Sequence, residues 1–343
     1  MIPFSAVYGL AVAIRNWFFD IGILRITQLR VPVISVGNIT AGGTGKTPFV
    51  ELVVRKLQAR GRKPAVLSRG YGRTTRGYLL VAGADKETIN AREGGDEPVE
   101  LAQSLRGTAI AVCENRVEGA QRLLAETSAD CIVLDDGFQH RYLHRDLNIV
   151  LLTAREILSG ERLLPAGNRR ERRSSLSRAD VVVISKCKNT QNFEEAAKRL
   201  DGWDRHKLVG IRLVPASLRN ALSVECVDRH SAQKTPVLAF CGVGDPDSFA
   251  DSVAGYGCEI VRAKIYPDHH QYSPSDLKVL QEEFSKHSAT MTITTRKDVV
   301  RLTTLGVKLE EFLKGVNLHV LEVVQEFLAG EEVIDTMLAR IAQ

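Results

Sequence analysis

The feature that most constrains this chain is a glycine-rich turn between a short apolar segment and a helical one. The apolar segment VPVISV covers residues 31–36, and a helical pattern runs from about 48 to 60. The turn reads GGTGKT and consists of Gly42, Gly43, Thr44, Gly45, Lys46 and Thr47. Glycines let backbone N–H groups converge on phosphate oxygens, and the helix N-terminus adds a positive partial charge. The pattern predicts a nucleotide site in which Lys46 reaches the β- and γ-phosphates and the Thr47 hydroxyl binds Mg²⁺.

The rest of the chain continues the alternation of short apolar runs and helical patterns. Strand-like runs occupy residues 64–68, 109–112, 131–135, 148–152 and 181–185, with helical patterns near 97–106 and 115–127. This order is typical of an α/β fold and predicts a P-loop NTPase-like, doubly wound, mostly parallel sheet, followed by a second, smaller α/β lobe. We expect a helix over 1–30, a nucleotide-binding domain over 31–205, linker strands over 206–235 and a smaller lobe over 236–343 that closes the cleft.

Composition excludes several classes of protein. The chain has 343 residues, 44% of them hydrophobic and 25% charged. This is an ordinary globular balance, which excludes collagen, low-complexity disorder and a polytopic membrane protein. The length is enough for roughly two domains. The six cysteines form no CxxC pair, so we expect neither a zinc site nor a disulfide framework, and we expect a reducing compartment.

The net charge of +5 is concentrated in one segment. From Arg141 to Arg178 the chain has nine arginines, no lysine and four acidic residues, so this segment alone accounts for the excess. Arginine forms bidentate contacts with phosphate, which favours an anion-binding surface here. The alternative is a solvated arginine-rich loop.

The first thirty residues form a strongly apolar helical pattern. Residues 1–14 carry no charged side chain, but this run is shorter than the roughly 20 residues that a membrane-spanning helix needs. No basic segment precedes it and no cleavage site follows, so we expect no secretory signal. Large apolar residues share one helical face: Phe4, Val7, Leu10, Ile14, Trp17, Phe18, Ile21 and Leu24. With arginines nearby, this pattern favours a helix lying in a membrane interface; the alternative is a helix packed on the protein's own core.

Two carboxylates follow the predicted strand over 131–135. Asp135 and Asp136 stand where a P-loop site usually places its second, metal-binding acid, and His140 follows one turn later. If the strand continues, the two carboxylates point to opposite sides. We then expect one to coordinate Mg²⁺ through water and the other to hold a neighbour; the alternative is a capped turn with a surface histidine.

Three further loops carry candidate side chains. Asp96, in GGDEP, either caps a helix or accepts a proton from an attacking hydroxyl, as a carboxylate does in kinases. In PDHH, over 267–270, a single histidine is expected to reach across the cleft to a carboxylate. Arg69 lies in SRGYGR after a strand, at the sheet edge where ligands bind in such folds; the alternative is an exposed turn.

Together these motifs closely resemble the tetraacyldisaccharide 4'-kinases, which phosphorylate the lipid A disaccharide precursor. The ordered set covers nearly the whole chain and comprises VPVISVGNITAGGTGKTP, SRGYGR, GGDEP, ENR (114–116), VLDDGFQH with RD at 145–146, LLPAG…RE (163–171), PDHH and TTRKD (294–298). The resemblance implies that the γ-phosphoryl group of ATP passes to the 4'-hydroxyl of a tetraacyl disaccharide 1-phosphate. It also implies Mg²⁺, a peripheral or monotopic place on the cytoplasmic face of the bacterial inner membrane, contact with anionic lipid, and no nucleic-acid partner.

The resemblance also implies roles for single residues. Lys46, Asp96 and His269 would be catalytic, with Asp96 as the base tuned by His269. The nucleotide would be held by the loop residues 42–47 with Asp136 and His140. The metal would be held by Thr47, Asp135 and Glu171, and phosphate or substrate groups by Arg69, Arg116 and Arg170.

The chain departs from the expected patterns at several positions. Thr40 stands at the first glycine of GxxxxGK[ST], Arg296 replaces the Glu of a TTEKD-type motif, and Arg169 and Arg172 replace the usual Leu and Pro beside Arg170. Two other classes stay open. A membrane-docked ATPase switch of the cell-division-positioning type would have lysine where this chain has Ala41, and a soluble small-metabolite kinase would not need the apolar first thirty residues.

Overall fold

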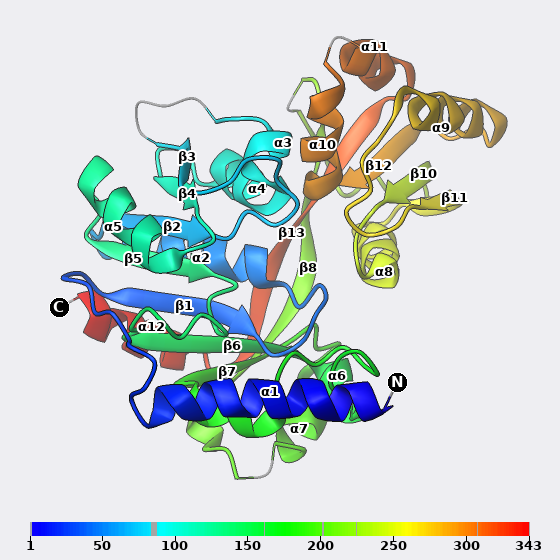
Figure 1. The fold of residues 1–343 in the computed structure, drawn as a ribbon. Coiled ribbons are helices and arrows are strands. Elements are labelled where there is room, and N and C mark those ends of the chain that lie inside the picture. The colour runs from blue at the N-terminus through cyan, green and yellow to red at the C-terminus, as the bar shows by residue number, and fades with distance from the viewer. Residues whose placement is uncertain are drawn as a thin grey trace.

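The computed structural model describes residues 2–83, 88–160, 162–200, 202–223, 225–306 and 308–342. The described residues form one sheet of 13 strands with helices on both faces (Figure 1). The strands are β1 (Val33–Asn38), β2 (Pro64–Ser68), β3 (Leu79–Ala82), β4 (Ile110–Val112), β5 (Cys131–Asp135), β6 (Leu147–Thr153), β7 (Val181–Ser185), β8 (Leu208–Asn220), β9 (Cys226–Val227), β10 (Pro236–Cys241), β11 (Glu259–Ile265), β12 (Met291–Thr295) and β13 (Leu318–Ala329). Their order is β11-β10-β12-β13-β8-β7-β6-β1-β5-β2-β4-β3, and β9 pairs with β8.

Strands β1 to β7 build the lobe that carries the glycine-rich loop. They pair in parallel, except that β3 runs antiparallel to β4. In β1, Ile34 and Val36 enter one apolar cluster and Val33 enters the cluster on the opposite face. Both faces are buried, which explains why these strands are continuous apolar runs. The predicted doubly wound, mostly parallel sheet is confirmed.

Helices cover both lobes. They are α1 (Ile2–Asp20), α2 (Lys46–Gln58), α3 (Ala91–Gly94), α4 (Asp96–Ser104), α5 (Arg116–Glu126), α6 (Ala154–Ser159), α7 (Thr190–Lys198), α8 (Pro246–Tyr256), α9 (Pro274–Lys286), α10 (Arg296–Leu302), α11 (Lys308–Gly315) and α12 (Glu331–Ala342). Helix α2 begins two residues before the predicted Pro48. Proline is tolerated there because the first turn of a helix leaves its N–H groups without intrahelical partners.

Two long antiparallel strands, β8 and β13, join the lobes (Figure 1). The first residues of β8 pair with β7 in the P-loop lobe, and the first residues of β13 pair with β12 in the second lobe. Each strand therefore runs from one lobe into the other. The predicted linker region, 206–235, contains β8 and β9, so it belongs to the sheet itself.

The second lobe is built on β10, β11 and β12, which pair in parallel. Helices α8 and α9 contribute to two separate apolar clusters of this lobe. The last helix, α12, packs elsewhere: its buried Ile334 and Leu338 join the cluster that contains Val53 and Leu57 of α2. The final helix of the predicted 236–343 lobe thus completes the core of the P-loop lobe.

Helix α1 contacts the protein through several polar side chains and the buried Phe19. Ser5 donates a hydrogen bond to the Leu163 carbonyl, and Tyr8 donates one to the Arg170 carbonyl. The predicted apolar face is the outer one, where the side chains of Phe4 and Leu10 are 70% and 60% exposed. Among the described residues, none of the helices is long and apolar enough to cross a bilayer.

Candidate active site

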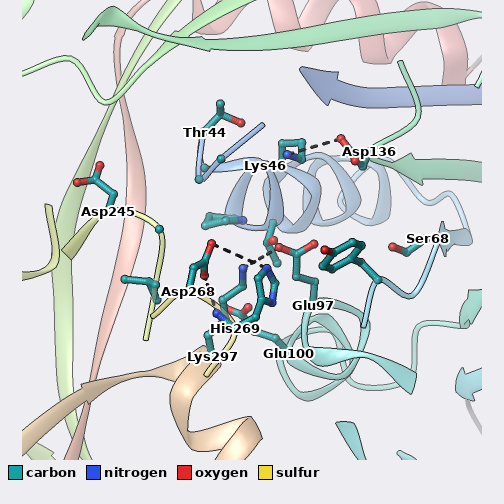
Figure 2. Close-up of a pocket in the computed structure, with 18 of the residues that line it drawn as sticks. Thr44, Lys46, Ser68, Glu97, Glu100, Asp136, Asp245, Asp268, His269 and Lys297 are labelled. Carbon is teal, nitrogen blue, oxygen red and sulfur yellow. Dashed lines mark hydrogen bonds and ion pairs between the residues drawn. The ribbon is translucent and has the colours of Figure 1, made fainter. Parts of the chain in front are cut away.

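A cavity of about 870 Å³ lies between the two lobes and is lined by the loop over residues 42–47. Tyr8 and Arg15 of α1 line the same cavity, and the second lobe contributes residues 243–245 and His269. Figure 2 shows Lys46 of α2 and His269 of the opposite lobe in this pocket. The carboxyl ends of the parallel strands thus face a space bounded by three parts of the molecule.

The glycine-rich loop is fixed by side chains from three strands. Asn38 Nδ2 donates to Thr44 Oγ1 at 3.2 Å, Ser185 Oγ donates to the Thr44 carbonyl at 2.8 Å, and Gln325 Nε2 donates to the Gly45 carbonyl at 3.0 Å. Gly45 has φ +82°, a conformation that favours glycine. The loop is therefore shaped before any phosphate binds, with the N-terminus of α2 facing the cavity.

The two aspartates after β5 occupy different environments. Asp136 lines the cavity, where its Oδ1 lies 3.6 Å from Lys46 Nζ (Figure 2). Its Oδ2 accepts a hydrogen bond from Arg170 at 2.7 Å. Burial tends to raise the pKa of Asp136, but the charges of Lys46 and Arg170 outweigh it and hold this pKa below its usual range. Asp135 is fully buried behind it, and Ser68 Oγ donates to its Oδ2 at 2.9 Å. Burial, with the charges of nearby acids, raises the pKa of Asp135 to about 7.

The oxygen atoms around the loop fit a Mg²⁺ ion beside a nucleotide. The described residues contain no group of three or more His, Cys, Asp or Glu side chains arranged as a metal site. Mg²⁺ at a nucleotide site needs only one or two carboxylates together with phosphate oxygens and water. Asp136 supplies a carboxylate in the cavity beside Thr47, and Oδ1 of the buried Asp135 has no hydrogen-bond partner among the described residues.

Asp96, at the start of α4, meets the second lobe. His269 Nδ1 lies 3.4 Å from Asp96 Oδ2, and Arg301 Nε of α10 donates to the same oxygen at 2.6 Å. Burial acts to raise the pKa of Asp96, but its contacts with His269 and Arg301 and the charge of the guanidinium prevail, so this pKa lies below its usual range. The structure brings together the predicted base and histidine; the sequence patterns did not identify Arg301.

Further ion pairs cross between the lobes. Lys297 Nζ donates to Glu97 Oε1 at 2.6 Å, and the Lys297 charge lowers the pKa of Glu97 to about 2 against the effect of burial. Lys186 pairs with Asp245 at 2.5 Å, and both line the cavity. The sequence analysis identified none of these four ion-pair residues, although Glu97 lies in GGDEP and Lys297 in TTRKD. Arg296, whose role stayed open, donates to Glu51 of α2 at 3.1 Å and to Ser104 of α4.

The remaining predicted site residues fall into two groups. Arg69, Arg116, His140 and Arg170 all line the cavity. Burial and nearby arginines lower the pKa of His140 to about 4, so its imidazole is neutral at neutral pH. Glu171 lies outside this group: it is buried beneath α1, where it accepts hydrogen bonds from Arg178 at 2.5 Å and Asn16 at 3.0 Å. The structure does not bring Glu171 to the predicted metal site.

The strand–loop–helix unit, the acids after β5 and the two-lobed cleft define a P-loop nucleotide enzyme.

A family model described as Tetraacyldisaccharide-1-P 4'-kinase matches residues 1–342. A tetraacyldisaccharide 4'-kinase of Chlorobaculum parvum is 36% identical over 344 residues, covering 99% of this chain and 94% of that protein. One of Geobacter metallireducens is 38% identical over 299 residues, covering 87% and 86%. The crystal structure of LpxK from Aquifex aeolicus in complex with ATP is similar at a TM-score of 0.78 and 31% identity, covering 100% of this chain and 98% of that one.

The chain therefore belongs to the tetraacyldisaccharide 4'-kinase family. Membership confirms the predicted fold class. It also confirms the predicted enzyme class, an ATP-dependent kinase of lipid A biosynthesis, against the ATPase switch and the small-metabolite kinase.

Proposed function

We propose that this kinase phosphorylates the 4'-hydroxyl of a tetraacyl disaccharide 1-phosphate with Mg²⁺-ATP while docked on the cytoplasmic face of the bacterial inner membrane. The observation that carries the proposal is the shared cavity: the loop over 42–47 and Tyr8 and Arg15 of the apolar helix α1 line one space. A glycolipid acceptor at the membrane surface would thus have its sugars close to the nucleotide.

The loop and Lys46 would bind the triphosphate of ATP. Backbone N–H groups at the start of α2 would donate to the phosphates, and Lys46, which lies 3.6 Å from Asp136, would place its charge on the γ-phosphate. Thr47 and Asp136 would hold Mg²⁺, with Asp135 behind them. Bound Mg²⁺ would neutralise charge on the phosphate oxygens, since phosphoryl transfer depends on positioning and charge stabilisation.

Asp96 would accept the proton of the attacking hydroxyl. Its low pKa keeps the carboxylate charged at neutral pH, and His269, 3.4 Å away, is 35% exposed toward the cavity side. The Asp96 side chain is 10% exposed, so the acceptor must enter the cleft to reach it. Closure of the lobes around both substrates would exclude water and limit ATP hydrolysis.

Arg69, Arg116 and Arg15 would bind anionic groups of the acceptor. All three line the cavity between the P-loop and α1. The neutral His140 beside them offers a hydrogen bond without adding charge. The sugar 1-phosphate is the group on this acceptor that arginine binds best.

The outward face of α1 would lie in the interface of an anionic membrane. A helix that buries its polar side and exposes Phe4, Leu10 and Trp17 reverses the usual pattern of a surface helix. Such an exposed apolar surface is typical of an interfacial anchor. Adjacent arginines would meet lipid head groups.

The decisive experiment measures phosphate transfer from ATP to a vesicle-bound tetraacyl disaccharide 1-phosphate. We expect Lys46→Ala and Asp96→Ala each to lower kcat by at least about 100-fold, because each removes charge or proton acceptance at the reacting groups. Thermal melting of Lys46→Ala should stay close to wild type, whereas Asp96→Ala should melt lower, because it leaves the fully buried Arg301 without its carboxylate partner, while staying folded at the assay temperature. Arg60→Met, which breaks a 2.7 Å ion pair with Asp335 remote from the cavity, is the matched control. Wild-type turnover in either cavity variant, or no transfer by the wild type, would refute the proposal.

A further inference from the structure

Arg301 is a fully buried charge at the back of the cleft. Its side chain is 0% exposed, and it lies on α10, in the lobe opposite the P-loop. An isolated buried guanidinium is costly, so its partners indicate what it does. Besides Asp96, it donates through Nη1 to the Gly242 carbonyl at 2.5 Å and to Asp298 Oδ1 at 3.2 Å.

Arg301 is the nearer of two partners of the same Asp96 oxygen. Its Nε lies 2.6 Å from Oδ2, whereas His269 Nδ1 lies 3.4 Å from Oδ2. A donor at 2.6 Å is well within hydrogen-bond range, and one at 3.4 Å is beyond the usual limit for N–H···O. Oδ1 accepts no hydrogen bond from the described residues, so it is the oxygen left to receive a proton.

Arg301 also contacts the histidine directly. Its Nη2 lies 3.3 Å from His269 Nδ1. A guanidinium only donates hydrogen bonds, so this contact is favourable only when Nδ1 carries a lone pair. The proton of the neutral imidazole then sits on Nε2, and Nδ1 cannot donate to Asp96 at the same time.

We propose that Arg301 is the positioning residue of the catalytic base: it takes Oδ2 of Asp96, leaves Oδ1 for the acceptor hydroxyl, and holds His269 in the Nε2–H tautomer. This inference rests on the proposed base role of Asp96. Arg301 is itself held by Asp298, which also accepts hydrogen bonds from Tyr272 and the Gly242 N–H. Helix α10 thereby orients a carboxylate on the opposite lobe.

Removal of the Arg301 charge changes the pH dependence in a defined direction. The ionisable groups around Asp96 and its two partners include Glu97 on α4, Lys46 on α2, and Lys297 and Asp298 on α10. Asp268 and Tyr71 contact His269, and Tyr272 donates to Asp298. Without the guanidinium, the pKa of Asp96 rises. A base that must be deprotonated then loses activity at a higher pH, so the acidic limb of the pH–rate profile moves upward.

Two substitutions separate charge from geometry. Arg301→Met should move the acidic limb of kcat upward by about 1–2 pH units, and it should lower kcat by about 10- to 100-fold with a smaller change in the KM for ATP. Arg301→Lys keeps the positive charge but loses the several N–H donors of the guanidinium. It should therefore lower kcat, while the acidic limb of the pH profile moves by less than about 0.5 pH unit. Arg60→Met again serves as the control and should change neither. A wild-type kcat in Arg301→Met, or an unmoved limb, would overturn the proposal.

A measurement on the wild-type chain covers the case in which Arg301→Met fails to fold. ¹⁵N NMR of labelled histidine, with His269 assigned from His269→Ala, should show that the neutral imidazole of His269 carries its proton on Nε2 and not on Nδ1. Protonation of Nδ1 instead would contradict the proposal. If the wild type transfers phosphate but the Arg301 variants and the NMR give the contrary results, only the role of Arg301 is refuted. If the wild type transfers no phosphate, the proposed function itself is refuted.

Discussion

The outward apolar face of α1 gives a quantitative test of membrane docking. We consider the double substitution Phe4→Ser and Leu10→Ser, because these side chains are 70% and 60% exposed. Full burial of such a side chain is worth about 1.5–3 kcal/mol, so inserting the exposed parts contributes about 1–2 kcal/mol each, or about 2–4 kcal/mol together. At about 1.4 kcal/mol per tenfold, vesicle partitioning should fall by roughly 30-fold to several hundredfold.

Flotation with vesicles of phosphatidylethanolamine and phosphatidylglycerol measures this partitioning directly. Val279→Ser is the matched control, since Val279 is 37% exposed on α9, far from α1 (Figure 1). The double variant should melt like the wild type because neither side chain is buried. Partitioning within about threefold of the wild type would refute the interfacial reading of α1.

Three other outcomes follow from the structure. Leu338→Ala should lower the free energy of unfolding by about 2–5 kcal/mol in urea titrations, because the fully buried Leu338 anchors α12 in the P-loop lobe; an unchanged midpoint would show that α12 does not stabilise this core. EDTA should abolish phosphate transfer, and added Mg²⁺ should restore it. Asp136→Asn should need at least about tenfold more Mg²⁺ for half-maximal activity; an unaltered Mg²⁺ titration would show that Asp136 does not bind the metal. His140→Asn should leave the pH–rate profile unmoved above about pH 5.5, since the pKa of His140 is about 4; a shifted profile would contradict a neutral His140.

Features carried by adjacent residues could be predicted from the sequence. The loop over 42–47 and the aspartates after β5 depend on neighbours in the chain and on strand ends, and the structure places all of these except Asp135 on the cavity. The sequence also predicted a helix at the N-terminus. What this helix packs against stayed open, because periodicity orders residues around a helix but does not identify its neighbours.

Features that depend on distant segments could not be predicted. Arg301 stands 205 residues after Asp96, and only the paired strands β8 and β13 bring α10 to α4. The family resemblance implied a metal role for Glu171, yet its side chain contacts Arg178, whereas that of the adjacent Arg170 contacts Asp136. The return of α12 to the first core likewise follows from β13 running back between the lobes.

The shared ribbon of β8 and β13 restricts how the enzyme can open. A flexible linker would let the two lobes rotate in any direction, but a hydrogen-bonded pair of strands deforms mainly by twisting or bending. The pairing is already irregular at Glu322/Val323, and Leu321, Glu322 and Val323 form part of the cavity wall. Any rotation of one lobe against the other must therefore change the strand geometry beside the cavity. A bound ligand that makes this part of the wall more rigid would also limit how far the lobes open.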